Sequence, residues 1–161
     1  MSITDGYTLN HKPALMGQIA DSQLRNVVSK TNTTDYVIPY GKGVVASGED
    51  GAKPPSSSSK ATDFVGVAAY EKVRVTLEGN DMGALPKYKF SCLNQGVIWV
   101  RVLEDVEARD KVFLRVGATG AGDFCKSAGS SATASVELDD VRFVSKAAAG
   151  NLAKISLKVG V

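Results

Sequence analysis

The sequence predicts an all-β fold, a small β-sandwich or barrel of about nine or ten short strands, preceded by an extended N-terminal arm. Three observations lead to this prediction. Hydrophobic residues make up 43% of the 161 residues but aromatic residues only 7%, so the core should consist mainly of Val, Ala, Leu and Ile. Sixteen glycines separate short apolar runs, as turns separate short strands. Several of these runs alternate apolar and polar residues with the period of two that a strand requires.

Residues 1–35 differ from the rest of the chain, and we expect them to form the arm. Their apolar residues do not alternate over any long stretch, and the spacing of Leu24, Val27 and Val28 is compatible with one or two helical turns. Such a segment suits a path along a partner better than a place in a compact core. Deleting most of it, residues 2–30, is therefore expected to leave a folded β domain.

The β domain is expected to span residues 36–161, with an exposed loop at 47–63 that contains two prolines and four consecutive serines. A change in alternation across Asp139-Asp140 predicts a turn or a β-bulge. The strands are predicted at residues 36–40, 43–46, 64–69, 71–77, 97–103, 111–116, 134–138, 141–145 and 151–161.

The stretch from Gly96 to Val116 contains the only tryptophan and four carboxylates within seven positions, Glu104, Asp105, Glu107 and Asp110. Paired carboxylates can act as acid and base when their pKa values are pushed apart. Here they lie between two apolar runs in a segment with the composition of a polar turn, so we interpret them as a solvated connection. The first run is apolar on both faces, which places Ile98, Trp99 and Val100 in the core or in a trimer interface.

The remaining candidates for chemistry are weak, so we expect no catalytic, cofactor-binding or metal site. Neither Gly41-Lys42-Gly43 nor the glycine-rich stretch 117–123 matches a phosphate-binding loop. The only histidine, His11, lies in the arm, which leaves a catalytic triad or a zinc site without ligands. Cys92 and Cys125 are expected to be reduced and buried.

Charge and hydropathy exclude two classes of partner. Nineteen basic and seventeen acidic residues give a net charge of +2, with no run of four Lys or Arg, so no nucleic-acid groove is expected. No apolar run is long enough for a membrane span. The N-terminal residues do not have the pattern of a signal peptide, so synthesis in a cytosol-like compartment is expected, and the sequon Asn32-Thr33-Thr34 should carry no glycan.

Six short motifs occur along the chain in this order: Gly17-Gln18-Ile19-Ala20-Asp21, IPYGKGVV from Ile38, FVGVA from Phe64, GVIWV from Gly96, a V-x-x-x-D-x-V-F pattern from Val106, and Gly150-x-Leu-Ala before the last strand. This ordered set resembles the structural cement, or head decoration, proteins of tailed bacteriophages. The resemblance extends from about Gly17 to the end of the chain. One departure is Arg109, at a position where the family more often has glycine.

The resemblance implies a non-enzymatic virion protein without a cofactor. It implies a homotrimer on the outer surface of the head that clamps neighbouring subunits of the major capsid protein. The apolar residues of the arm are then the expected capsid contacts: Leu15, Met16, Ile19, Leu24, Val27 and Val28. Main-chain hydrogen bonds allow such an arm to add to a partner's sheet without catalytic groups.

Two other functions remain open at this point. Another β-rich virion component, a tail or head-completion protein, would differ in copy number, because a cement protein is present in far more copies per particle than a connector. A soluble ligand-binding β module would need exposed aromatic residues among basic ones, and KYKF at 87–90 is the only such fragment.

Overall fold

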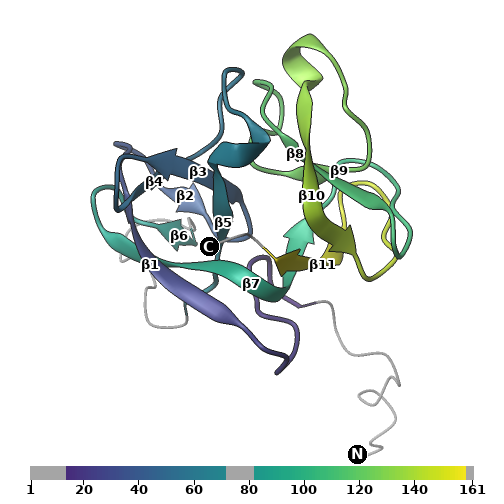
Figure 1. Cartoon of the computed structure of the whole chain (residues 1–161), viewed down its shortest axis with the longest axis horizontal. Helices are drawn as coiled ribbons and strands as arrows, with labels where there is room; N and C mark the ends of the chain where they lie inside the picture. Colours follow the sequence, from purple (N-terminus) through teal and green to yellow (C-terminus); the bar gives the residue numbers. More distant parts are fainter. Residues whose placement is uncertain (1–13, 72–81, 159–161) are drawn as a thin grey trace, which may run out of the picture.

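The computed structural model describes residues 14–71 and 82–158, which are almost entirely β structure (Figure 1). The predicted all-β fold class is confirmed. Most of the strand predicted at 71–77 lies outside the described residues. The strands are β1 (Asn26–Asn32), β2 (Ile38–Pro39), β3 (Gly43–Ser47), β4 (Gly51–Lys53), β5 (Phe64–Ala68), β6 (Gly83–Ala84), β7 (Lys89–Arg101), β8 (Lys111–Arg115), β9 (Phe124–Cys125), β10 (Ser135–Phe143) and β11 (Leu152–Lys158), with single 3₁₀ turns η1 (Ala61–Asp63) and η2 (Ser131–Thr133).

The main sheet closes on itself twice, and both closures use β7. Its strand order is β1-β4-β3-β5-β7-β11-β10-β8-β9, and β1 also pairs with β7. The β1–β7 pairing closes a ring of five strands, β1, β4, β3, β5 and β7, which we call the first ring. The other strands leave from the second half of β7, and a parallel bridge between Val102 and Phe124 brings β9 back to its end. We call this group, β7, β11, β10, β8 and β9, the second ring; the two lie on opposite sides of Figure 1 with β7 crossing between them.

Strand β7 spans both rings because it has thirteen residues, more than any other strand described. Its first half pairs with β1 and β5, and its second half, from Gln95 to Arg101, pairs with β11. Gly96 marks the change of partner, with a φ of 128° that a side chain rarely allows. A Cβ there would lie 3.1 Å from the Cβ of Arg25, so glycine also permits the start of β1 to approach.

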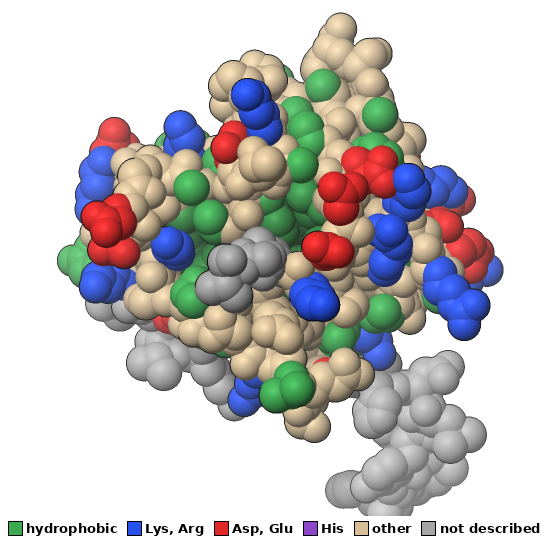
Figure 2. Space-filling model, in the orientation of Figure 1, with side chains coloured by type: hydrophobic (Ala, Val, Ile, Leu, Met, Phe, Trp, Pro, Cys, Tyr) green, Lys and Arg blue, Asp and Glu red, His purple; other side chains and the backbone are tan. Residues whose placement is uncertain are grey.

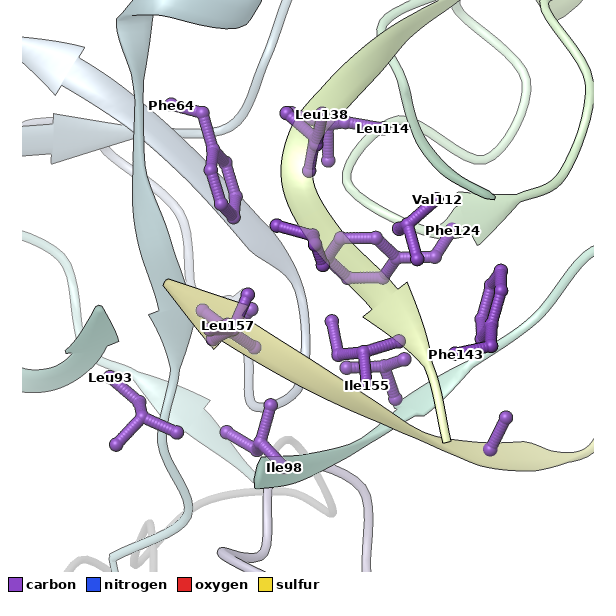
Figure 3. Packing of buried hydrophobic residues seen from close by; sticks show 14 of the residues in the cluster. Phe64, Leu93, Ile98, Val112, Leu114, Phe124, Leu138, Phe143, Ile155 and Leu157 are labelled. Atoms are coloured by element: carbon purple, nitrogen blue, oxygen red, sulfur yellow. The ribbon is translucent and has the colours of Figure 1, made fainter. Parts of the chain in front are cut away.

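Each ring has its own hydrophobic core. The first-ring core consists mostly of small side chains: Ile38, Val44, Ala52, Ala68, Ala84, Phe90 and Cys92. The larger cluster fills the second ring and its junction with β5, and Figure 3 shows its members Phe64, Leu93, Ile98, Val112, Leu114, Phe124, Leu138, Phe143, Ile155 and Leu157 pointing toward one another. Burial of these large side chains is the main stabilising contribution to this half of the molecule.

The structure corrects the expected extent of the arm. Residues 26–32 form β1, which pairs antiparallel with β7 and parallel with β4, instead of the helical turns compatible with their spacing. Val28 packs against the first-ring core, so tertiary contacts decided the local structure. Residues 1–13, including His11, lie outside the described part of the chain.

The loop expected at 47–63 is also more structured than its composition suggests. Residues 51–53 form β4, which joins β1 to β3, and Ala52 is fully buried. Ser56, Ser57 and Ser58 are exposed, as expected for the serine run. The prediction therefore holds for the serines and fails for the strand that precedes them.

In the second half, the strands predicted at 111–116 and 151–161 are observed as β8 and β11, whereas those predicted at 134–138 and 141–145 form one strand, β10. Strand β11 has the expected alternation, with Ala153, Ile155 and Leu157 buried. Strand β10 has a register shift between Leu138 and Arg142, which is the bulge that the sequence indicated.

Candidate interaction surface

The residues before β1 form an additional short strand along β7. The backbone N–H of Gly17 donates to the carbonyl of Trp99 at 2.8 Å, and the N–H of Trp99 donates to Gln18 at 3.0 Å. The N–H of Ala20 donates to the carbonyl of Val97 at 2.8 Å. This segment thus lies on the edge of β7 opposite β11 and is held by main-chain hydrogen bonds of its own chain.

Gly17 and Gly41, one from each of the first two sequence motifs, contact each other and allow the N-terminal segment to pack against the first ring. Both have a positive φ, 81° and 79°. A Cβ on Gly17 would lie 2.6 Å from the backbone nitrogen of Gly41, and a Cβ on Gly41 would lie 2.4 Å from Met16. The N–H of Tyr70 also donates to the carbonyl of Gly17 at 2.8 Å. The first two motifs therefore form one contact between the N-terminal segment and the first ring.

The six apolar residues expected to bind the capsid fall into two groups. Leu24, Leu15 and Val27 are exposed, with 88%, 49% and 42% of their surface accessible. Met16, Ile19 and Val28 are partly buried. Ile19 packs against the second-ring cluster and Val28 against the first-ring core, so these two hold the segment on its own domain. Leu15 lines a hollow, whereas Leu24 and Val27 lie outside it, and we call these two the N-terminal apolar residues.

Of the three residues expected in the core or a trimer interface, two lie in this chain's own core. Ile98 and Val100 are fully buried, in the second-ring cluster. Trp99 is partly buried, and the Nζ of Lys154 lies 5.2 Å from its ring centroid, a cation–π contact across β7 and β11. The residues that bury the apolar run of β7 belong to the same chain, so this run is not evidence for a trimer.

The four carboxylates after β7 have structural partners in the connection to β8. The interpretation as two strands and a turn is confirmed, because β7 ends at Arg101 and β8 begins at Lys111. Two of the carboxylates bind neighbouring loops: Glu104 accepts a hydrogen bond from the hydroxyl of Ser127, and Asp105 accepts one from the backbone N–H of Ala149 at 2.8 Å. Within the turn, Asp110 accepts a hydrogen bond from the backbone N–H of Glu107 at 2.9 Å. Glu107 forms an ion pair with Lys146 at 3.2 Å.

The two glycine-rich stretches that superficially suggested phosphate loops pack against each other where the rings meet. The N–H of Gly43 donates to the carbonyl of Gly122 at 2.8 Å. Lys42 forms an ion pair with Asp123, with 2.8 Å between Nζ and Oδ1, and both side chains are largely buried. The contact joins the start of β3 to the turn before β9, so these glycines pack at the junction of the rings.

Asn32 is a structural residue that the sequence did not reveal. It is fully buried, and its amide nitrogen donates to the carbonyls of Tyr36 and Ala84 at 2.9 and 3.0 Å. Its amide oxygen accepts from the N–H and the hydroxyl of Thr34 at 2.9 and 2.7 Å. One side chain thus fixes two loops at the end of the first ring, a role for which the sequence offers only an Asn-x-Thr pattern.

Charged residues do not gather into one basic surface on the face shown in Figure 2, where both signs alternate around the rim. Between the rings the same view shows a hollow with apolar side chains. Its volume is about 180 Å³, with Phe64, Leu138 and Val141 among its lining residues and Asp139, Asp140 and Lys158 beside them.

Within residues 14–71 and 82–158, no three His, Cys, Asp or Glu side chains are grouped to hold a metal ion. None of the helical segments in the same part of the chain is long and apolar enough to cross a membrane. Cys92 and Cys125 are free and buried, and burial raises the pKa of the Cys92 thiol to about 12.

The comparison with protein families decides the identification. The family model described as structural cement protein (E217 gp24/Pam3 gp6) matches residues 3–158. The chain belongs to the structural cement protein family of bacteriophages. The resemblance seen in the motifs is therefore confirmed, and the role is that of a phage capsid structural protein.

A solved structure of a phage capsid contains a chain with this fold. A chain from the structure titled "The capsid of Myoviridae Phage XM1" is similar over 98% of both chains, with a TM-score of 0.72 at 14% identity. A chain from "The crystal structure of head fiber gp8.5 N base in bacteriophage phi29" covers 84% of this chain and 98% of its own, with a TM-score of 0.41 at 12% identity. The search of curated proteins found no match.

Proposed function

We propose that this cement protein binds the outer surface of the assembled head as a homotrimer and clamps neighbouring subunits of the major capsid protein. It is made in the host cytoplasm and becomes part of the virion. Its action is mechanical and needs neither catalysis nor a cofactor. Membership of the structural cement family supports the capsid role.

The observation that carries the proposal is the exposure of the N-terminal apolar residues on a fixed segment. Leu24 is 88% exposed and Val27 42%, so the apolar surface of both side chains is available to a partner. The hydrogen bonds to β7 already hold residues 17–20 in place. Because this backbone is ordered before binding, less conformational entropy is lost when the exposed side chains meet a capsid subunit.

A clamp requires contacts with more than one capsid subunit. Each copy presents Leu24 and Val27, both exposed, directly after the residues 17–20 that are held on β7. Three copies in a trimer triple the number of such contacts. Joint binding of linked sites raises the apparent affinity by about 10²–10⁴ without any new contact. Weak contacts at each subunit are therefore sufficient to hold the head together.

The test is binding of purified protein to heads that lack it. In the double variant Leu24→Asp/Val27→Asp, two carboxylates replace the apolar contacts, and we expect at least a tenfold loss of apparent affinity. The matched control is Val144→Asp, which changes a valine of similar exposure, 45%, outside the N-terminal segment. The control should bind like the unmodified protein, and both variants should have an unchanged unfolding midpoint.

Head stability provides the second readout of the same experiment. Heads decorated with the unmodified protein or with Val144→Asp should release DNA at a higher temperature than bare heads. Heads incubated with the double variant should release it at the temperature of bare heads. Full occupancy and full protection by the double variant would show that another surface binds the capsid.

A further inference from the structure

A hollow of about 460 Å³ lies between the N-terminal segment and the turn before β11. One side is formed by Ala14, Leu15 and Met16, and the other by the turn residues Gly150, Asn151 and Leu152. The volume is in the range of about 300–1,000 Å³ that is usual for sites that enclose a ligand. Most of the lining side chains are apolar, so the hollow suits an apolar segment of chain.

Arg101 places one positive charge in this hollow. It is the last residue of β7, is exposed, and has no ion-pair partner within the described residues. An arginine beside apolar side chains favours a carboxylate, because the guanidinium can donate two parallel hydrogen bonds to it. The hollow therefore matches a segment with apolar residues and one acidic residue.

The N-terminal sequence has this composition. In Ser2 to Leu9 the alternate residues Ile3, Asp5, Tyr7 and Leu9 share one face of an extended chain, and the intervening residues are Thr4, Gly6 and Thr8. Asp5 is the only acidic residue among the thirteen that precede Ala14. Apolar side chains thus flank a single carboxylate, the complement of the hollow and of Arg101.

We infer that the hollow of each copy binds residues 2–9 of a second copy, with Asp5 paired to Arg101 of the neighbour. Thirteen extended residues span about 43 Å. A domain of this size is roughly 40 Å across, so the segment can reach an adjacent copy. Ala14 itself lines the hollow, so residues 2–9 of the same chain could enter it only by reversing direction within the few residues that precede Ala14.

The exchange gives a physical basis for self-association, on which the proposed homotrimer depends. Each copy donates a segment and accepts one, so the contact is heterologous and closes into a ring when the rotation between copies allows it. The inference rests on the self-association in the proposed function, and it is independent of what the trimer binds.

The experiment uses two single cysteine variants of the full chain, Asp5→Cys and Arg101→Cys. They are mixed in equal amounts and oxidised mildly, and the disulfide is mapped by mass spectrometry. Exchange between copies predicts a bond that joins residue 5 of one variant to residue 101 of the other. Cys92 and Cys125 are buried and should not take part. The matched control is Asp5→Cys mixed with Ser127→Cys, an exposed position outside the hollow, for which no specific bond is expected.

A charge reversal tests the pairing without a disulfide. Arg101→Glu alone and Asp5→Arg alone should each lower the association constant about tenfold or more in sedimentation experiments, and the chain that carries both changes should recover it. Absence of the 5–101 bond between copies, both in solution and on decorated heads, overturns the inference. So does a 5–101 bond that forms only within the double cysteine chain, because the segment then occupies its own hollow. Binding to heads is measured separately. If the chain forms the 5–101 bond between copies but does not bind heads, the proposed function is rejected and the inference stands.

Discussion

The first and second rings share β7 but are held together by different means. The first-ring core is built from alanine, valine and other mostly small side chains, and its strands approach closely at glycines. At Gly66, whose φ is 145°, an added Cβ would lie 2.3 Å from the carbonyl oxygen of Leu93 on β7. The second ring is filled by large side chains such as Phe124 and Phe143. The stability of the first ring should therefore fall with substitutions that add side-chain atoms or remove hydrogen bonds. The stability of the second ring should fall with substitutions that reduce side-chain volume.

The N-terminal segment depends on both rings, which links this difference to function. Gly17 touches Gly41 of the first ring, and Ile19 packs on the second-ring cluster. A change in either ring can therefore displace the N-terminal apolar residues without altering them. When a variant loses capsid binding, the structure of each ring must therefore be measured before the loss is attributed to a missing contact with the capsid.

The two cysteines allow this measurement, because each ring contains one. Cys92 belongs to the first-ring core and Cys125 to β9 of the second ring. The thiolate is the reactive form, and burial raises the pKa of Cys92 to about 12, so labelling at neutral pH requires local opening. The ratio of the two labelling rates therefore reports which ring opens.

The largest effect is expected from Phe143→Ala in the second ring. Phe143 is fully buried, and truncation leaves a cavity, so the free energy of unfolding should fall by about 3–5 kcal/mol. Urea unfolding measures the loss, and Cys125 should become reactive before Cys92. Phe143→Leu, which keeps most of the volume, is the control. Equal acceleration at both cysteines would mean that the rings open as one unit.

Asn32→Asp tests the hydrogen bonds of the first ring and should have the next largest effect. The change keeps the size of the side chain but removes the two donors to Tyr36 and Ala84 and introduces a buried acid. We expect a loss of about 3 kcal/mol, with Cys92 exposed first. Asn151→Asp, at an exposed position, is the control and should be nearly neutral. A near-neutral result for Asn32→Asp would show that these bonds are replaced by water.

The smallest effect is expected from Arg109→Gly, and it is a gain. Arg109 has a φ of 78°, a left-handed conformation that costs a side chain about 1 kcal/mol relative to glycine. The variant should raise the free energy of unfolding by about that amount. Ala108→Gly, at the adjacent exposed position, should lower it. Destabilisation by Arg109→Gly would indicate that the arginine side chain makes a contact that outweighs the backbone strain.

The sequence predicted the fold class and most strands because short-range alternation reports burial directly. The pattern in β11 and the bulge in β10 are local properties of the chain. The departure at Arg109 was visible only through the family resemblance. The structure shows that Arg109 has a φ of 78° in this turn.

What the sequence did not predict depends on pairings between distant residues. Strand β1 lacks clean alternation, and it is a strand because β7 and β4 supply partners far along the chain. The buried role of Asn32 arises from carbonyls at 36 and 84, which no local pattern brings together. The six apolar residues of the N-terminal segment looked equivalent, yet packing separates Ile19 and Val28 from the exposed residues.

The position of β1 also changes an expectation about truncation. Deleting residues 2–30 would remove most of β1 and open the first ring, so the shortened chain should not keep a stable fold. A deletion that ends before Ala14 leaves every described strand intact. This shorter deletion is the one suited to separate the role of the N-terminal residues from the stability of the domain.

The central claim is that this cement protein clamps the head from outside through the N-terminal apolar residues. A cryo-electron microscopy reconstruction of heads incubated with the full chain tests it most directly. The account predicts density for the two rings on the outer surface, with Leu24 and Val27 against major capsid protein and one trimer touching more than one capsid subunit. Density on the inner surface, or a bound chain whose Leu24 and Val27 face solvent, would contradict it.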